Sequence, residues 1–520
     1  LQNSHNLKKK FYTESILLII LGLATSLSLP PFNYFLLNFF TFPLFYLFLL
    51  KKLDNSKNFW QFFFYGWLFG FGYFISNLYW IPISLTFDQN FKFLIPIATI
   101  LIPSFLSLFY GLVTYLFAIF KTKGDVNSIL LFSLIFGIVE FIRGLFFTGF
   151  PWNLIAYSFS NQLEIISILS IIGTYGFNLF CISLFTSPSL FFLNNKSKNY
   201  LFCIFFVFVS LFSFVYGSYN KERFYNAEKK NFDPYIRLIG SNISIDRFYS
   251  NVNSVLVIEE LIKISDPNKS DKTIFVWPEG ILPEISQKEL KEYYWLFEKK
   301  FNKNHLFIIG INYLDKENGP TKFYNSLSVY NNNLELLDSY NKIKLVPFGE
   351  FLPFEKILKF LGLRSLTNNY QSFSAGGERN IIEIKKEKFS LKILPLICYE
   401  IIYSGRLFND SDFDLIVNIS EDGWFGSSIG PKQHFVHSIF RAIESGKYVL
   451  RSSNNGISAI INPTGFVEQK IDLGQAGYLD FKASRKIQPT VFSIYGNKTF
   501  GLLILLYIFL IFSFNRNKNE

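Results

Sequence analysis

The first 218 residues consist of long apolar runs separated by short polar stretches. A helix needs about 20 apolar residues to cross the hydrocarbon core of a bilayer. With one further run near the C-terminus, the pattern predicts eight membrane spans, at about residues 13–31, 34–50, 59–81, 93–120, 127–147, 165–193, 199–218 and 498–514. The first run lacks a clear small-x-small cleavage site and another apolar run follows at once, so we interpret it as a retained span and not as a signal peptide.

Residues 219–497 show a different pattern, in which short β-rich runs alternate with amphipathic stretches such as Val255–Ile264 and Gln433–Ser445. The strand-like runs are Tyr235–Ile243, Thr273–Trp277, Leu306–Ile311, Leu391–Cys398, Leu415–Ile419 and Tyr448–Leu450. We therefore predict an α-helical polytopic membrane domain with seven spans in residues 1–218 and an α/β domain in residues 219–497. A last span and a tail follow in residues 498–520.

Charge placement predicts the orientation of these parts. The net charge of +11 could indicate nucleic acid, but many Lys and Arg residues lie in short tracts between apolar runs, and we expect no nucleic-acid partner. If the N-terminus is cytoplasmic, the inner flanks hold twelve Lys and Arg residues and the short outer loops hold Lys92 alone. The positive-inside rule then places residues 219–497 outside the cytoplasm, tethered at both ends.

Three polar signatures follow strand-like runs in the α/β part: Val276–Glu279, Tyr340–Lys342 with Leu345–Glu350, and Leu396–Glu400. Each places a reactive group just after a strand, where α/β folds build active sites. A carboxylate can take the proton of a thiol, and an ammonium group can stabilise both a thiolate and an oxyanion. The combination predicts nucleophilic thiol chemistry at one edge of a sheet.

Each signature alone has a simpler structural interpretation. A cysteine after a strand is more often a core residue, and Trp-Pro-Glu is more often a turn. Of the three cysteines, Cys181 and Cys203 lie in apolar runs, so Cys398 has no disulfide partner in the α/β part. His434 and His437 lie three residues apart without a third ligand nearby, so we expect no metal and no other cofactor.

The order Glu279, Lys342, Cys398 resembles the Glu-Lys-Cys triad of the nitrilase superfamily, whose fold is an α-β-β-α sandwich. With the flanking membrane helices, Leu345–Glu350 and Cys398–Glu400 resemble one branch of it, the apolipoprotein N-acyltransferases. Further matches are Thr148–Trp152, Trp424–Gly426, Gly430–His434, Arg441-Ala442 and Arg451–Ile457.

Two stretches depart from this family pattern. Gly240–Ile243 stands where the family has Gln-x-Asn-Ile, and Glu421–Trp424 stands where it has Asn-Asp-x-Trp. The resemblance implies that Tyr249 and Trp424 contact the substrate, through a loose alignment in the case of Tyr249. The departures therefore concern substrate contacts and leave the triad intact.

The resemblance implies a ping-pong acyltransferase in which Glu279 is the general base, Cys398 the nucleophile and Lys342 the oxyanion donor, aided by the main-chain N–H of Tyr399. Supporting roles fall to Glu350 beside Lys342 and to Glu400 beside the nucleophile. The implied donor is a membrane phospholipid, and the implied acceptor is the α-amine of diacylglyceryl-cysteine in an apolipoprotein. The expected protein is a monomer of the bacterial inner membrane with its catalytic domain on the periplasmic side.

In the membrane part, Glu140 and Arg143 lie three residues apart on one predicted span. A lone charge there costs about 2.5–3.5 kcal/mol, so we expect the two to pair, with a lipid headgroup as a further candidate partner. Two rival functions are a membrane-anchored nitrilase-type amidase, which would need only one anchoring helix, and a transporter with a binding domain. A transporter should carry ionisable residues in several spans, and most of these spans carry none.

Overall fold

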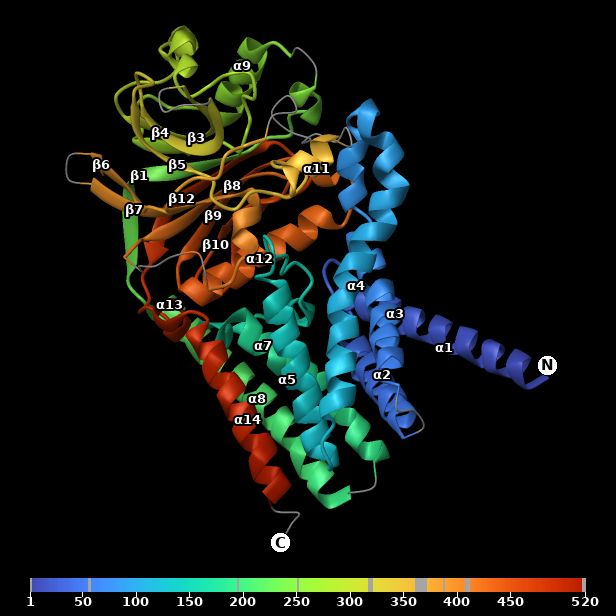
Figure 1. Ribbon diagram of the computed structural model, residues 1–520. Helices are drawn as coiled ribbons and strands as arrows, with labels where there is room; N and C mark the ends of the chain where they lie inside the picture. Colours follow the sequence, from blue (N-terminus) through green and yellow to red (C-terminus); the bar gives the residue numbers. More distant parts are fainter. Residues whose placement is uncertain are drawn as a thin grey trace. The chain divides into compact units, whose positions relative to one another are not determined.

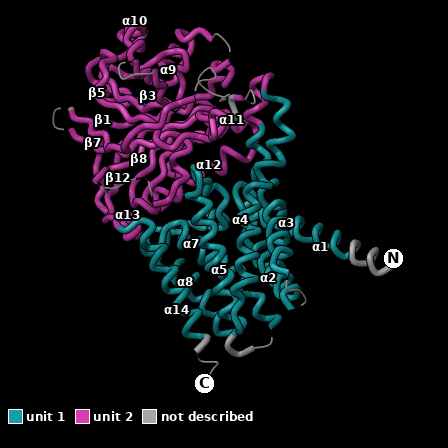
Figure 2. The backbone as a smooth tube through the Cα atoms, viewed as in Figure 1, with its two compact units in different colours: residues 1–82, 91–220, 495–520 teal, residues 83–90, 221–494 magenta. Residues whose placement is uncertain are grey.

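The computed structural model describes residues 2–54, 58–193, 196–249, 252–316, 321–360, 372–386, 389–405, 407 and 412–516. The chain divides into two compact units, coloured separately in Figure 2. Unit 1 comprises residues 1–82, 91–220 and 495–520, and unit 2 comprises residues 83–90 and 221–494.

Unit 1 is helical. Its helices are α1 (Gln2–Ser26), α2 (Asn38–Leu53), α3 (Phe59–Leu78), α4 (Ile95–Phe120), α5 (Asp125–Arg143), α6 (Leu163–Ile166), α7 (Leu169–Thr186), α8 (Lys196–Asn226) and α14 (Lys498–Arg516), with α8 and the short α13 (Val491–Tyr495) crossing into unit 2. A helix lies at each of the eight predicted spans. Five segments of the described chain are long and apolar enough to cross a membrane: Phe35–Leu53, Gln89–Phe120, Asp125–Arg143, Leu169–Phe192 and Asn199–Asn226. The helical membrane region is confirmed, and the count of eight spans stays a prediction.

Small residues allow helices α1 and α3 to pack closely. A Cβ atom on Gly22 would lie 2.0 Å from the main-chain oxygen of Phe69, and one on Gly72 would lie 2.1 Å from that of Ile19. Since neither neighbouring atom belongs to a side chain that could move away, these positions require glycine for the observed approach of the two backbones.

Unit 2 contains two six-stranded sheets. The first has the order β12-β1-β2-β3-β4-β5, formed by Gly477–Arg485, Lys229–Gly240, Thr273–Val276, His305–Asp315, Lys322–Asn331 and Leu336–Asn341. The second has the order β11-β10-β9-β8-β7-β6, formed by Val467–Ile471, Ser458–Ile461, Tyr448–Asn454, Leu415–Glu421, Phe389–Ile397 and Ile382–Lys386. The predicted strand-like runs are all confirmed as strands, within small differences at their ends.

The two sheets face each other and carry helices on their outer faces, as Figure 1 shows within this unit. Helices α9 (Ser254–Ser265) and α10 (Tyr294–Phe297) pack on the first sheet around a core that includes Trp277. On the second sheet lies α12 (Gly430–Ser445), of which every residue except Lys432 is buried. Between the sheets, the hydroxyl of Ser452 in β9 donates to main-chain oxygens of β1 and β2 at 2.7 and 3.1 Å. The predicted α-β-β-α sandwich is therefore the observed fold.

Strand direction brings the three signatures to one edge of the sandwich. Strands β1, β2 and β3 are parallel to one another, and so are β7, β8 and β9. Because β4 reverses the direction and β5 reverses it again, β5 ends at the same edge as β2. Glu279 follows β2, Lys342 follows β5 and Cys398 follows β7. The carboxyl ends of the strands thus carry all three groups.

Candidate active site

The ammonium group of Lys342 lies between two carboxylates. Its Nζ atom is 3.0 Å from Oε1 of Glu279 and 3.0 Å from Oε1 of Glu350. The side-chain amide of Asn325, in β4, donates to the same two oxygens at 2.7 and 2.8 Å. All four side chains are buried. The amide and the ammonium together hold both carboxylates in fixed positions.

This arrangement keeps Lys342 charged. Burial lowers the pKa of Lys342, but the charges of Glu279 and Glu350 outweigh it and hold that pKa well above its ordinary value. Burial raises the pKa of Glu350, and the Lys342 charge offsets part of that rise. A lysine that stays protonated cannot serve as a base, but it can attract negative charge.

Cys398 begins a short 3₁₀ turn, Cys398–Ile402, immediately after β7. Its φ of 48° lies in the left-handed region, which costs a non-glycine residue about 1–3 kcal/mol. Burial and the charge of Glu279 raise the pKa of the thiol well above its ordinary value, although Lys342 lowers it. The thiol of Cys398 is therefore neutral at rest, and a base would have to remove its proton before it could act as a nucleophile.

Glu400 links the turn Cys398–Ile402 to the loop that carries Lys342. Its Oε2 accepts the main-chain N–H of Ile397 at 2.9 Å, while Oε1 accepts the Tyr340 hydroxyl at 2.6 Å and the main-chain N–H of Ile343 at 3.1 Å. Arg379 adds a 2.5 Å contact to the same Oε1. The Tyr399 ring packs edge-on against Tyr403 at 5.6 Å, and the oxyanion role of its main-chain N–H stays a prediction.

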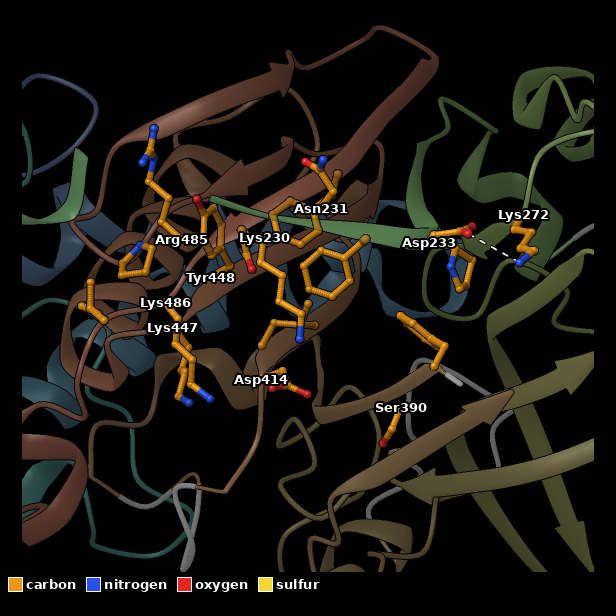
Figure 3. Close-up of a pocket in the computed structure, with 18 of the residues that line it drawn as sticks. Lys230, Asn231, Asp233, Lys272, Ser390, Asp414, Lys447, Tyr448, Arg485 and Lys486 are labelled. Atoms are coloured by element: carbon orange, nitrogen blue, oxygen red, sulfur yellow. Dashed lines mark hydrogen bonds and ion pairs between the residues drawn. The ribbon is translucent and has the colours of Figure 1, made fainter. Parts of the chain in front are cut away.

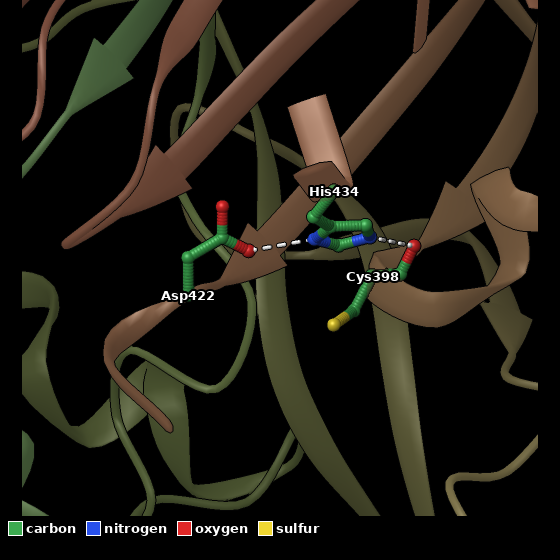
Figure 4. A group of neighbouring side chains, drawn as sticks. All are labelled: Cys398, Asp422 and His434. Carbon is green, nitrogen blue, oxygen red and sulfur yellow. Dashed lines mark hydrogen bonds and ion pairs between the residues drawn. The ribbon is translucent and has the colours of Figure 1, made fainter. Parts of the chain in front are cut away.

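His434 connects the strained turn to a buried acid. Figure 4 shows its ring between the Asp422 carboxylate, at 2.9 Å from Nδ1, and the main-chain oxygen of Cys398, at 3.2 Å from Nε2. Potential ligand atoms of these three residues lie within 4.8 Å of one another. However, Arg451 Nη2 is 2.8 Å from Asp422 and 3.1 Å from His434 Nδ1. A guanidinium already supplies the positive charge there, so this donor set does not suit a metal ion.

Glu421, one of the departures from the family pattern, forms a buried ion pair with Arg247. Asn454 Nδ2 and Asn455 Nδ2 also donate to Glu421, at 2.7 and 3.3 Å, so the carboxylate has three donors from other segments. The main-chain N–H of Glu421 donates to Oε2 of Glu279 at 2.9 Å. The pair therefore fixes the backbone segment that holds the second oxygen of the proposed base.

The predicted substrate-contact residues fall into two groups. In unit 2, the rings of Tyr249 and Trp424 lie 6.1 Å apart, and Phe248 lies 5.1 Å from Trp424. In unit 1, Glu140 and Arg143 form the expected ion pair on α5, with Arg143 Nε 2.9 Å from Glu140 Oε2. Arg143 also donates to two main-chain oxygens of the following loop. Contact of these residues with lipid or substrate stays a prediction.

Comparison with known proteins gives matches to both parts of the chain. The family described as Apolipoprotein N-acyltransferase N-terminal domain matches residues 21–187, and that described as Carbon-nitrogen hydrolase matches residues 272–480. An Apolipoprotein N-acyltransferase of Rhizobium leguminosarum is 31% identical over 91% of this chain and 90% of its own length. The chain belongs to the apolipoprotein N-acyltransferase family.

A second relative matches a larger share of the chain, and a solved structure matches at lower identity. The Apolipoprotein N-acyltransferase of Rickettsia typhi is 32% identical over 96% of this chain and 98% of its own length. Among solved structures, a Saccharomyces cerevisiae member of branch 10 of the nitrilase superfamily is 18% identical, with a TM-score of 0.32 over 48% of this chain and 89% of that one. The likeness to the Rickettsia relative extends over both units of the chain.

The motifs did not reveal several residues of the site. Asn325 contacts Glu279 across 46 positions of sequence, and Arg379 contacts Glu400 across 21. Neither lies in a motif. Arg247 could have been suspected, because a carboxylate in the place of the family asparagine at Glu421 needs a compensating charge if it is buried.

We predict that Glu279→Gln lowers the pKa of the Cys398 thiol while reducing acyl transfer about 10²–10⁴-fold. The substitution removes a negative charge that raises this pKa and leaves Lys342, which lowers it. The pH dependence of alkylation by iodoacetamide measures the pKa, with Cys398→Ala as the blank for Cys181 and Cys203. An unchanged or higher thiol pKa in the variant would contradict the electrostatic assignment.

We predict that Arg247→Leu destabilises the protein by about 3–5 kcal/mol, because Glu421 would be left buried without its cation. Burial already raises the pKa of Glu421. The loss in free energy of unfolding should therefore be smallest at low pH, where this carboxyl is protonated, and largest at pH values above its pKa. Thermal unfolding measures the loss. Lys272→Leu, which breaks the exposed pair with Asp233, is the control and should cost less than about 1 kcal/mol. The double variant Arg247→Leu/Glu421→Gln should recover much of the loss; a double variant no more stable than Arg247→Leu would refute this view of the pair.

Proposed function

We propose that the chain transfers a fatty acyl group from a membrane phospholipid, through a thioester on Cys398, to the α-amine of diacylglyceryl-cysteine in an apolipoprotein. The observation that carries this proposal is the buried ammonium of Lys342 between Glu279 and Glu350, at the strand edge that also bears Cys398. Family membership supports the acyltransferase activity, and the printed names of the relatives support the apolipoprotein acceptor.

The first half-reaction forms the thioester. Glu279 takes the proton of the Cys398 thiol, and the thiolate attacks an ester carbonyl carbon of the phospholipid. Lys342, held charged, attracts the oxyanion; loss of such a donor typically costs about 3–4 kcal/mol. The ester C–O bond then breaks, and Glu279 returns the proton to the departing lysophospholipid oxygen.

The second half-reaction forms the amide. The acceptor amine attacks the thioester carbonyl, Glu279 takes a proton from the nitrogen, and the C–S bond breaks. The released thiolate of Cys398 regains the proton from Glu279. Cys398 is only 7% exposed, which supports protection of the thioester from water until an acceptor arrives.

We propose the following finer assignments on the same basis. Residues 1–218 and 498–520 embed the chain in the bacterial inner membrane, and residues 219–497 form the catalytic domain on the periplasmic side; the distribution of Lys and Arg supports this orientation. Glu350 and Glu400 position Lys342 and the nucleophile turn. The enzyme acts as a monomer, because one chain supplies every group of the mechanism.

The test is to incubate the purified protein with labelled phospholipid and no acceptor, and to look by mass spectrometry for an acyl adduct. We expect a hydroxylamine-sensitive acyl mass on Cys398, absent in Cys398→Ala and in Glu279→Gln. Cys203→Ala removes a different buried thiol and should retain the adduct. Folded protein that forms no adduct and releases no fatty acid would overturn the phospholipid donor.

A further inference from the structure

Unit 2 has a cavity of about 860 Å³ at the edge of the sandwich opposite the candidate active site. Its lining includes Lys272, Asn304, Asp414 and Lys447, the residues that directly precede β2, β3, β8 and β9. The triad follows the carboxyl ends of strands that run in the same direction. The cavity is therefore separate from the site at Cys398.

The lining of this cavity is strongly cationic, with six basic and two acidic side chains. One acidic group, Asp233, pairs with Lys272 at 3.4 Å. Within the part of the chain that the structure describes, Lys230, Lys447 and Lys486 form no ion pair. The cavity thus holds positive charge that the described carboxylates do not neutralise.

Lys447 is the most enclosed of these cations. It is half-buried, and its Nζ donates to the main-chain oxygen of Phe413 at 2.5 Å. Burial and the neighbouring charge of Lys486 lower its pKa, against the opposing effect of Asp414 and Asp412. Figure 3 shows the ends of Lys447 and Lys486 beside each other. An anion placed between like charges would relieve their repulsion.

Aromatic rings form the apolar part of the lining. The ring of Phe481 lies 5.3 Å from that of Phe232 and 4.9 Å from that of Tyr448, and Phe389 lies 6.4 Å from Phe232. Phe481 and Tyr448 are buried, but a small inorganic anion would leave the half-buried rings of Phe232 and Phe389 in contact with water. A molecule with an anionic head and an apolar body would use both parts of the lining.

The chain connects this cavity directly to an apolar helix. Lys230 lies four residues after Asn226, where the candidate span Asn199–Asn226 ends. Four residues reach at most about 14 Å when fully extended. The connection therefore keeps Lys230 within this reach of the C-terminal end of α8. Lipid headgroups are the abundant anionic amphiphiles at a membrane surface.

We infer that the basic cavity, lined by Lys230, Lys447 and Lys486, binds the phosphate-bearing headgroup of an anionic membrane lipid. This lipid is not the acyl donor, because the cavity lies at the edge opposite Cys398. Its binding would hold the catalytic domain against a membrane surface. The inference goes beyond the proposed reaction and needs only that the chain is a membrane protein.

The test uses the full chain in neutral detergent, with Cys398→Ala as the background so that no lipid is consumed. Isothermal titration with short-chain phosphatidylglycerol measures the lipid affinity, with phosphatidylcholine of the same chain length and inorganic phosphate as the other arms. The triple variant Lys230→Gln/Lys447→Gln/Lys486→Gln is compared with Lys291→Gln/Lys299→Gln/Lys300→Gln, which removes the same charge from exposed positions outside the cavity.

We expect the first triple variant to weaken phosphatidylglycerol binding at least about ten-fold and the second to leave it nearly unchanged, since only the first removes cations that attract the lipid phosphate. Equal losses of phosphatidylglycerol affinity in both variants would mean that the affinity depends only on net charge, and this would overturn the proposed site. Inorganic phosphate bound as tightly as the lipid would overturn the lipid assignment. Thioester formation, assayed separately with Cys398 restored, should persist in both variants, so failure here is distinct from failure of the proposed reaction.

Discussion

The buried ammonium of Lys342 makes two 3.0 Å contacts, one with Glu279 and one with Glu350, and the rest of the site is arranged around them. A charge removed from water is tolerated only if partners surround it, and two carboxylates side by side are tolerated only if a cation lies between them. The side-chain amide of Asn325 donates a further hydrogen bond to each of the same two carboxylate oxygens. The cluster therefore holds its charges in place before any substrate arrives.

The sandwich fold brings this cluster to the edge that also bears Cys398, the proposed nucleophile. Glu279 and Lys342 come from the first sheet and Cys398 from the second, so the distance between thiol and base depends on how the sheets pack. Glu400 links the Lys342 loop to the turn after β7, and the main-chain N–H of Glu421, at the end of β8, donates to Glu279. The contacts of Glu400 with Ile343 and of Glu421 with Glu279 therefore join the two sheets at this edge.

The sequence was sufficient for the main strands and for placing Glu279, Lys342 and Cys398 at one edge of the sandwich, because each of these residues follows an apolar run within a short local motif. It was insufficient where the pattern is exposed or the partner is distant. Strand β11 has three exposed polar residues in its centre, so no apolar alternation marks it. Asn325 and Arg379 are ordinary residues in sequence, and their roles depend on strand neighbours that only the folded chain defines.

The central claim is that the acyl group on Cys398 is destined for an amine. A single-turnover chase tests it most directly: acyl-enzyme freed of excess lipid is mixed with a diacylglyceryl-cysteine peptide, with the α-amine either free or acetylated. The account predicts an amide-linked acyl group on the free peptide only, together with return of the free Cys398 thiol. Release of the label as free fatty acid, at the same rate with both peptides, would contradict it and indicate a hydrolase.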